Sequence, residues 1–582
     1  MRFLQSPGVQ TREIDKTNVV PSTSTSIGGY AGSFGWGPCN KATLVNSEKD
    51  LSLLFGTPTK KLANSFETAA SFLKYGNALY VSRAIDTDSS APAFNAKSDA
   101  GTTARLIQSE EAFEALAIAA SDRVYAKYPG AMGNSIKVEF AFAADGGTFS
   151  VTPAYDELVS APAGTSTDAA AAGISNDEVH VIVIDEDGKF TGAPGTVLEV
   201  YENLSILSDA KGETGSSIYV ESIINNDSDY IYVNIQSFAD SFAIPTDAGD
   251  SITDIVAAQS IPYTIDASSA GFVASEISSS LTSGSDGDIY DPGSVVIALD
   301  EFNSDEIDNA FLFAQGFAAS IDQTTVTAEI DAITASRKDV VGFISPYIDV
   351  NDVSDVKTFF DAVSSSSYLF FDSTPVYTYD KYNDQYIWIP ACGHIAGLCA
   401  ETDEVAAPWF SPAGYNRGQL KGVIKLKINA RNQADRDLLY KSRINPVISQ
   451  PGQGILLFGD KTALSKPSAF DRINVRRLFI VLRKDISEAA KYQLFELNDE
   501  FTRSMFRSMV NPTLRDVQGR RGITEFLVIC DETNNTGEVI DTNNFVGDIY
   551  IKPARSINYI RLNFVSTRTG VDFSEQVGLA SV

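Results

Sequence analysis

The feature that most constrains this chain of 582 residues is a long stretch with almost no positive charge. Between residues 140 and 330 the basic residues are Lys189 and Lys211, against 32 acidic ones. Such a segment cannot neutralise itself and repels the phosphate backbone of a nucleic acid. We therefore interpret it as a solvated outer surface and exclude nucleic-acid binding there, with a functional acidic patch as the open alternative.

The C-terminal part of the chain has a different charge balance. Residues 401–582 carry 25 Lys and Arg against 21 Asp and Glu, whereas the other 400 residues carry 20 against 54. The net charge of the whole chain is −30. Positive charge therefore gathers near the C-terminal end, where five arginines follow one another closely: Arg503, Arg507, Arg515, Arg520 and Arg521.

Length and composition indicate a soluble protein of several domains. A chain of this length exceeds one ordinary hydrophobic core, and 43% hydrophobic with 21% charged residues is normal for globular domains. The sequence contains neither the apolar segment of a signal peptide nor an apolar run of about 18 residues, so we predict no membrane insertion. Four cysteines without metal-ligand spacing are typical of reduced thiols in a cytoplasm.

The first third of the chain predicts an α/β layer interrupted by an insertion. Residues 1–20 lack a helical pattern and predict an extended arm. "NSEKDLSLLFG" predicts a helix capped by Asn46 or Ser47 and ended by Gly56; a similar helix and the buried strand "ALYVSRAI" follow. Near Asp86 the composition turns to Ser, Ala, Thr, Gly and Asp, with short strands such as "HVIVIDEDGKF" and "YIYVNIQSF".

The last 120 residues predict a helix packed on a small sheet. "INVRRLFIVL" has the composition of a buried strand, and Asp485 with Glu488 forms a capping box for a helix over 486–510. That helix would place Arg503 and Arg507 on an exposed face, opposite an apolar face made of Ile486, Ala490, Leu494, Leu497, Phe501 and Met505. "ITEFLVIC" and "NYIRLNFV" predict strands, and a second extended arm follows.

The predicted fold class is therefore α+β and multidomain. An α/β core is joined to a C-terminal helix-on-sheet domain, a β-rich insertion and two extended arms. The predicted boundaries are an N-terminal arm at 1–20, a core at 21–85 plus 300–460, an acidic insertion of two modules at 86–299, a C-terminal domain at 461–565 and a C-terminal arm at 566–582.

The chain offers little for enzyme chemistry, so we predict no catalytic, cofactor or metal site. "GILLFGDKT" approaches a phosphate-binding loop, but Asp460 stands where the lysine should be and would repel phosphate. Cys392 and His394 suggest a thiol nucleophile, although a packed cysteine and a hydrogen-bonded histidine are more common. The acidic runs at 185–188 and 531–541 lack calcium-loop spacing and predict turns.

Several stretches resemble the tail sheath proteins of contractile-tailed bacteriophages. They are "SPGVQTREID" with "VVPSTSTSIGGYAGSFGWGP", then "KYPGAMGNSIKVE", "WIPACGHIAGLCAETDEVAAPWFSPAGYNRGQL" and "INPVISQPGQGILLFGDKT". The strongest lies at the end, from "DRINVRRLFI" through "FTRSMFRSMVNPTLRDVQGRRGITEFLVICDETNN" to "NNFVGDIYIKPARSINYIRLNFVSTRTGVDF". The matches cover roughly half the chain in the family's order, and residues 141–300 match nothing in it.

The resemblance implies a virion protein, assembled in the host cytoplasm as stacked hexameric rings around a tail tube. Its partners would be further copies, the tube protein, and baseplate and tail terminator proteins, with no direct nucleic-acid contact. The C-terminal domain would lie innermost and the insertion outermost. The arms would add strands to neighbouring subunits through Val9, Thr11, Arg12, Ile14, Val571 and Phe573.

The resemblance also suggests roles for the clustered arginines. Arg503 and Arg507 would face the tube, with ordinary surface pairing, such as Asp499 with Arg503, as the alternative. Arg515, Arg520 and Arg521 would brace the turn after the helix, or pair with Asp516 and Glu525 of the same or a neighbouring subunit.

With no nucleotide site predicted, contraction would draw on free energy stored during assembly. Three other functions remain open at this stage: a receptor-binding or adhesive surface protein, a hydrolase that uses the region of Cys392 and His394, and the sheath of a non-phage contractile injection system.

Overall fold

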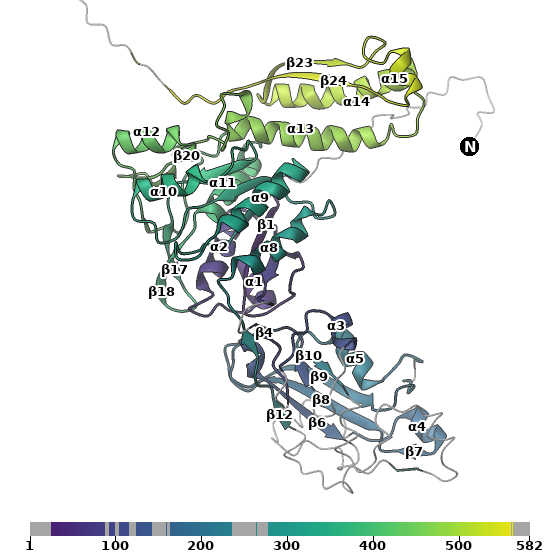
Figure 1. The fold of residues 1–582 in the computed structure, drawn as a ribbon. Helices are drawn as coiled ribbons and strands as arrows, with labels where there is room; N and C mark the ends of the chain where they lie inside the picture. The colour runs from purple at the N-terminus through teal and green to yellow at the C-terminus, as the bar shows by residue number, and fades with distance from the viewer. Residues whose placement is uncertain are drawn as a thin grey trace, which may run out of the picture.

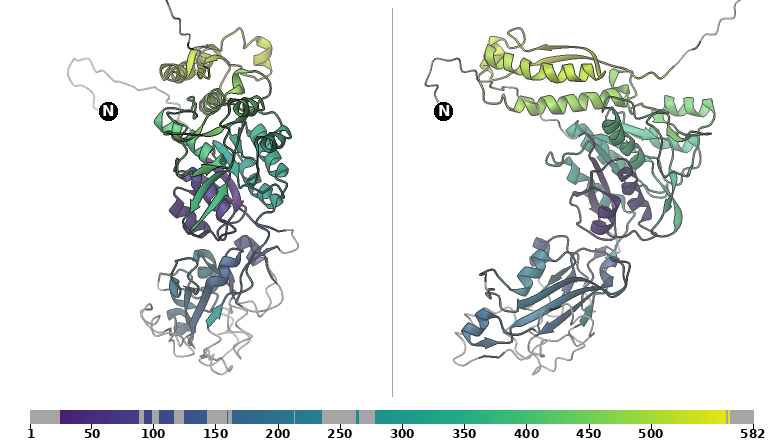
Figure 2. Two further views of the ribbon diagram at one scale, coloured as in Figure 1. Left: turned by 90° about the vertical axis from the view of Figure 1, so that its left-hand side faces the viewer. Right: turned by 180° about the vertical axis from the view of Figure 1, so that it is seen from behind.

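A computed structural model describes residues 25–87, 92–98, 104–115, 124–142, 159, 163–212, 214–234, 263–264, 278–559 and 562. The predicted arms at 1–20 and 566–582, and most of the strand predicted for "NYIRLNFV", lie outside these residues. The described elements form three tiers along one long axis, with a β-rich part at one end, a mixed α/β part in the middle and paired helices at the other end (Figures 1 and 2).

The middle tier is built on a seven-stranded sheet in the order β2-β3-β1-β14-β15-β16-β20. All neighbours are parallel except β2, which pairs antiparallel with β3. Gly28 of β1 pairs with Phe311 of β14, so strands from before and after the acidic block lie side by side. The strands are β1 (Gly28–Ser33), β2 (Thr43–Val45), β3 (Leu79–Ala84), β14 (Phe311–Ala314), β15 (Val341–Ile344), β16 (Leu369–Asp372) and β20 (Ile444–Asn445).

Helices cover both faces of this sheet because its strands are apolar on both sides. One face packs against α1 (Glu48–Phe55), α2 (Ala63–Leu73) and α11 (Cys392–Val405). The other packs against α8 (Pro292–Asp300), α9 (Thr324–Arg337), α10 (Val353–Asp361) and α12 (Gln433–Lys441). The predicted start of the first helix is confirmed: the Ser47 side chain accepts a hydrogen bond from Asp50 N at 3.1 Å.

Smaller antiparallel sheets complete the middle tier. One has the order β18-β17-β19, and the other is the β21-β22 hairpin. The strands are β17 (Val376–Asp380), β18 (Gln385–Ile389), β19 (Lys425–Leu426), β21 (Val447–Gln450) and β22 (Gly454–Leu457).

The β-rich tier has a hydrophobic core of its own around a sheet in the order β12-β6-β8-β9. Its strands are β6 (Ile136–Phe142), β8 (Glu178–Asp185), β9 (Thr196–Ser205) and β12 (Ser278–Ser280). Shorter elements surround it: β4 (Ala93–Phe94), α3 (Glu110–Glu114), β5 (Val124–Ala126), α4 (Thr167–Ala172), β7 (Ile174–Ser175), α5 (Val220–Asp227), β10 (Ile231–Val233), β11 (Tyr263–Thr264) and β13 (Ser285–Asp286).

A buried arginine joins this tier to the central sheet. Arg83 of β3 donates to the carbonyl oxygens of Phe34 and Gly37, at 2.9 and 3.0 Å, and of Pro129, at 2.6 Å. The bond to Pro129 reaches across to the β-rich tier. The Trp36 ring of the middle tier also crosses the neck between the two tiers, where it packs against Tyr128 and Phe190.

The third tier contains α13 (Ile473–Lys491), α14 (Glu500–Gly519), β23 (Ile523–Ile529), α15 (Gly537–Asp541) and β24 (Asp548–Pro553). The strand predicted for 473–482 is wrong, because these residues begin α13. Ile473 and Ile480 pack on the central core, whereas Leu478 and Leu482 pack on the C-terminal cluster. A helix buried on two sides loses the single apolar stripe by which a helix is recognised, and its β-branched residues then mimic a buried strand.

The single helix predicted for 486–510 is also wrong. Asp485 lies inside α13, and the chain turns after Lys491, with Phe495 in the left-handed region at φ 71°. A new helix begins at Glu500, capped by Asp499, whose side chain accepts from Thr502 N at 2.8 Å. The turn divides the predicted apolar face: Ile486 and Ala490 pack inside, but Leu494, Leu497 and Phe501 are more than 60% exposed.

The predicted arrangement of a helix on a small sheet is confirmed, although one strand differs. Phe526 and Val528 of β23 and Ile549 and Ile551 of β24 pack against the cluster that contains α14. The partner of β23 is β24 at 548–553, a strand that the sequence pattern did not predict.

A buried carboxyl group lies at the C-terminal edge of the central sheet. Asp372 ends β16, accepts a hydrogen bond from the Ser345 hydroxyl and accepts another from Thr374 N at 3.2 Å. Ser345 Oγ in turn accepts from Cys392 N at 2.9 Å, at the start of α11. Burial raises the pKa of Asp372 from its ordinary 3.8 to about 7.

Replacing Asp372 by Asn should reduce the pH dependence of stability. In the wild type the unfolded chain loses this proton near pH 3.8 and the folded chain only near 7, so the free energy of unfolding falls as pH rises between these values. Asp372→Asn removes this contribution, on the order of 1–4 kcal/mol. Urea unfolding of both proteins between about pH 4.5 and about pH 7.5 measures it. Equal slopes for the two proteins would refute the assignment; Asp361→Asn, at an exposed position, is the control.

Candidate functional site

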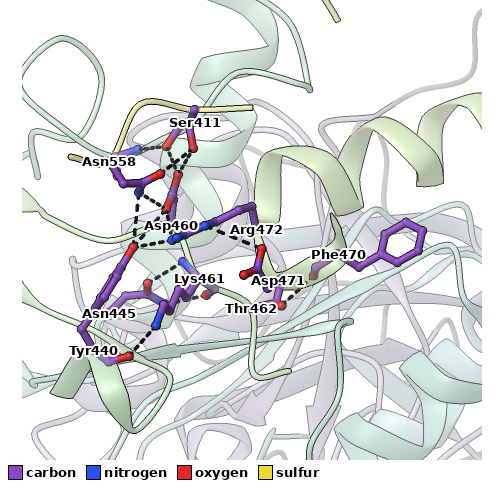
Figure 3. Close-up of polar contacts among 12 residues, drawn as sticks. Ser411, Tyr440, Asn445, Asp460, Lys461, Thr462, Phe470, Asp471, Arg472 and Asn558 are labelled. Carbon is purple, nitrogen blue, oxygen red and sulfur yellow. Dashed lines mark hydrogen bonds and ion pairs between the residues drawn. The ribbon is translucent and has the colours of Figure 1, made fainter. Parts of the chain in front are cut away.

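A buried carboxylate, Asp460, joins three parts of the chain (Figure 3). Its side chain is 2% exposed and follows β22 in the middle tier. It accepts hydrogen bonds from Arg472 Nη1 at 3.0 Å, just before α13, and from Ser556 Oγ at 2.7 Å and Asn558 Nδ2 at 2.8 Å, just after β24. Residues 556–558 are therefore tied to the core through Asp460, and Asn558 also donates to the Tyr440 hydroxyl at 3.3 Å.

The loop that contains Asp460 is also tied to the central sheet. Its hydrogen bonds give the residues of the incomplete phosphate-loop motif a structural role. Asn445 of β20 accepts from Lys461 N at 2.8 Å and donates to Phe371 O of β16 at 2.9 Å. Thr462 Oγ1 donates to Phe470 O at 2.8 Å (Figure 3). The "GDKT" residues thus fasten the loop between β22 and α13, and the carboxylate of Asp460 is engaged by Arg472.

A second buried ion pair holds the opposite end of the described chain. Arg477 of α13 donates to both carboxylate oxygens of Asp403 in α11 at 2.6 Å, and the two side chains are 4% and 6% exposed. Thr25, the first described residue after the N-terminal arm, donates to the same carboxylate at 3.0 Å. Arg472 and Arg477 are about 7.5 Å apart along a helix, so the two carboxylates that bind Thr25 and Ser556 both pair with arginines at the start of α13.

The sheet of the third tier is open at its edges. β23 and β24 pair only with each other among the described residues. Leu527 and Tyr550 stand opposite each other in the register, on the face away from α14, and are 56% and 58% exposed. An unpaired edge beside exposed apolar side chains is a surface that readily accepts another strand.

Arg503 and Arg507 do not form the exposed pair that the sequence predicts. Arg503 is 5% exposed and donates to Asn498 Oδ1 at 3.0 Å, because the helix starts later than predicted and the side chain turns into the α13–α14 connection. Arg507 donates to Cys530 O at 2.9 Å and pairs with Glu500 at 2.7 Å. Asp499 caps the helix instead of acting mainly as a partner of Arg503. The tube-facing role stays a prediction.

The other three arginines surround the turn after α14. Arg520 pairs with Asp516 at 3.8 Å and lies 4.9 Å from the centre of the Trp409 ring, whose indole N–H donates to Arg520 O at 3.0 Å. Arg521 adopts φ 67° at the turn itself. Arg515 is exposed. The predicted partner Glu525 pairs instead with Lys552 on the neighbouring strand.

The groups considered for enzyme chemistry are engaged in packing. Cys392 and His394 lie on α11, and both are buried. Burial raises the pKa of the Cys392 thiol to about 12 and lowers the pKa of His394 well below its usual value. His394 Nδ1 shares a hydrogen bond with the Tyr75 hydroxyl at 3.1 Å. A protonated thiol beside a histidine held in this way is a poor nucleophile.

The acidic run at 185–188 forms a turn, as predicted. Asp185 accepts from the backbone N–H groups of Lys189, Phe190 and Thr191 at 2.8–2.9 Å. In the described part of the chain, no group of three or more His, Cys, Asp or Glu side chains is arranged to hold a metal ion. Within the same residues, no helix combines the length and apolar character that a membrane span requires.

The predicted arm residues, Val9, Thr11, Arg12, Ile14, Val571 and Phe573, lie outside the described residues. Sequence reasoning missed Asp460 and Asp403 as attachment points. A partial signal existed, because three arginines, Arg472, Arg476 and Arg477, gather in a segment with buried apolar residues, where each needs a partner. Their acidic partners are too distant in sequence for any local pattern to indicate them.

Comparisons with known proteins agree on one family. Residues 298–463 match the phage tail sheath protein central domain, and residues 465–567 match the phage tail sheath C-terminal domain. The tail sheath proteins of Vibrio phage KVP40 and Enterobacteria phage T4 are each 35% identical to this chain over 99% of its length and 100% of their own. A sheath tail protein from Listeria innocua has a similar fold, with a TM-score of 0.53 at 12% identity over 92% of this chain and 96% of that one.

Replacing Asp460 by Ala should loosen the inner end of the C-terminal arm. Arg472 would lose its buried partner, so the free energy of unfolding should fall by about 2–4 kcal/mol, measured by urea unfolding. Limited proteolysis should cut the variant faster between residues 554 and 559, the segment that holds Ser556 and Asn558. Asp471→Ala removes a longer, more exposed contact of Arg472, at 3.7 Å, and should cost less than about 1 kcal/mol. Equal losses for the two variants would contradict the role of Asp460.

Proposed function

This chain belongs to the phage tail sheath family, and on that premise we propose that it polymerises as stacked hexameric rings around a tail tube and contracts to drive the tube through the host envelope. The protein is a structural component of a contractile sheath, and its place is the virion tail. The observation that carries the proposal is that Thr25 and Ser556, from the described segments nearest the two predicted arms, are held by Asp403 and Asp460, in a chain whose C-terminal sheet has open edges among the described residues.

The arms would connect the copies by strand addition. We propose that residues 1–20, through Val9, Thr11, Arg12 and Ile14, and residues 566–582, through Val571 and Phe573, add to the edges of β23 and β24 in neighbouring copies. A donated strand of five or six residues makes about five main-chain hydrogen bonds, each worth roughly 0.5–1.5 kcal/mol net. The free energy of each junction is modest, but its repetition through many copies makes the network of connected subunits stable.

The three tiers suggest how the subunit would be oriented in the sheath. The C-terminal domain at 461–565 would lie innermost, the core at 21–85 and 300–460 in the middle, and the acidic insertion at 86–299 outermost. Two features support this orientation: the helices α13 and α14 and the β-rich tier lie at opposite ends of the molecule (Figure 2), and the insertion has an excess of charge that favours solvent.

Partners other than sheath copies would include the tube protein, baseplate proteins and a terminator protein. Of the two arginines proposed to face the tube, Arg507 is the better placed, because 28% of its side chain is exposed against 6% for Arg503. We propose a role without catalysis, and a contraction that draws on free energy stored in the extended assembly.

Removing either arm should stop polymerisation without unfolding the subunit. Chains lacking residues 1–20 or 566–582 should show the thermal unfolding and circular dichroism of the full chain, because each described tier has a hydrophobic core of its own. Electron microscopy should show tubes or rings for the full chain and single subunits for both truncated chains. Tubes formed by a truncated chain would exclude strand donation by the missing arm.

Contraction of isolated sheaths should release heat without a nucleotide. Extended sheaths triggered by mild denaturant should show an exothermic transition in a calorimeter, on the order of a few kcal/mol per subunit, because the contracted packing is the more stable one. Adding a nucleotide should leave the heat unchanged. Contraction that strictly requires ATP would contradict the stored-energy proposal.

A further inference from the structure

A large cavity opens beside Asp460, where the chain leaves β24 toward the C-terminal arm. Its volume is about 860 Å³, and its walls come from all three neighbouring parts: the segment after α11, the helix α12 and residues 554–559. This volume lies within the range of sites that hold several side chains or a small ligand. The cavity is therefore large enough to receive a loop of another protein chain.

Arginines give this cavity a positive lining in a strongly acidic protein. Arg417, Arg436, Arg521 and Arg555 line it, against Asp437 and Asp460. Asp460 is already paired with Arg472. Within the described residues, no carboxylate lies within 4 Å of the guanidinium groups of Arg417, Arg521 or Arg555. Three unpaired guanidinium groups facing one cavity favour an anionic occupant.

Some of these groups are held in place before any partner arrives. Arg417 Nε donates to Ser411 O at 3.0 Å, and its guanidinium lies 5.3 Å from the centre of the Phe410 ring. At Arg521 the backbone is fixed, because its main-chain N–H donates to Gln518 O at 3.0 Å in the turn after α14. Exposed apolar side chains at the rim, Phe458, Ile557 and Tyr559, would add contact area around the charges. A positioned, partly apolar surface of this kind is typical of a protein interface.

The complementary surface lies at the other end of α13. Residues 300–308, "DEFNSDEID", contain five acidic residues and no basic one, and 303–306 are exposed. Asp308 pairs with Lys484, and this contact fixes the loop beneath the second half of α13. Asn474, which lines the cavity, precedes Lys484 by ten residues, or about 15 Å along the helix. Figure 1 shows the same separation, with α12 at the left of the core and α8, which leads into the acidic loop, at its right.

We propose that the acidic loop at 303–308 of one copy docks in the arginine-lined cavity of the next copy. Because the two surfaces lie at opposite ends of α13, the acidic loop does not contact the cavity of its own subunit. Their opposite charges favour contact between the loop of one subunit and the cavity of a neighbour. A head-to-tail contact of this kind repeats from copy to copy and closes into a ring when the rotation allows. The inference rests on the proposed sheath function and assigns it a contact that is independent of the arms.

A charge-exchange experiment on the full chain tests this contact. The first variant is Arg521→Glu with Arg555→Glu, and the second is Asp305→Arg with Glu306→Arg. Each alone places like charges in the contact and should raise the protein concentration needed for polymers roughly tenfold or more. An equal mixture should recover to within about threefold of the wild type, because each cavity then meets a loop of opposite charge. The four changes combined in one chain should recover in the same way.

Controls separate this contact from folding and from the arms. Lys60→Glu with Lys61→Glu reverses two exposed charges away from the cavity and should leave polymerisation unchanged. Circular dichroism verifies that each variant is folded. If the wild type polymerises but the mixture does not recover, the docking proposal is wrong and the sheath function stands. The same conclusion follows if either double variant polymerises normally by itself. A single variant that polymerises normally but fails to bind tubes would overturn it in favour of a tube contact. A wild-type chain that forms no polymers would overturn the sheath function itself.

Discussion

Two ion pairs made by arginines at the start of α13 hold the C-terminal helices against the core of the subunit. Arg472 binds Asp460 and Arg477 binds Asp403, so α13 is fastened to the core at the points where both arms leave the described fold. A buried charge without its partner is costly, which makes each pair specific in geometry even if its net contribution to stability is small.

This arrangement explains why positive charge gathers near the C-terminal end of an acidic protein. Much of it serves internal attachment: Arg476 lies against the rings of Tyr368 and Phe470, and Arg503 closes the connection between α13 and α14. Arg417, Arg521 and Arg555, which have no carboxylate partner within 4 Å in the described structure, line the cavity next to Asp460. One local excess of positive charge thus supports two functions, the anchoring of helices and the proposed contact between copies.

The three tiers differ in how they are stabilised, and this difference fits a machine that moves by rearranging rigid parts. The central sheet is covered on both faces, and the β-rich tier has its own core, joined to the sheet at a narrow neck by Arg83. The third tier is thin, with α14 under a two-stranded sheet and α13 beneath α14 (Figure 1). The open sheet edges of this tier are where the proposed strand addition between copies would take place.

The sequence by itself determined the features that depend on local chemistry. The Ser47 cap, the buried strand β3, the Asp185 turn and the packing of a helix on β23 all followed from residue types and their spacing, and the quoted motifs indicated the family. The tertiary structure decided the rest, because the causes are distant in sequence. Residues 473–482 form a helix since two separate cores bury opposite sides of it, and the partner of Arg477 lies 74 residues earlier, in α11. No local pattern contains these contacts, so only the folded chain reveals how α13 is held against the core.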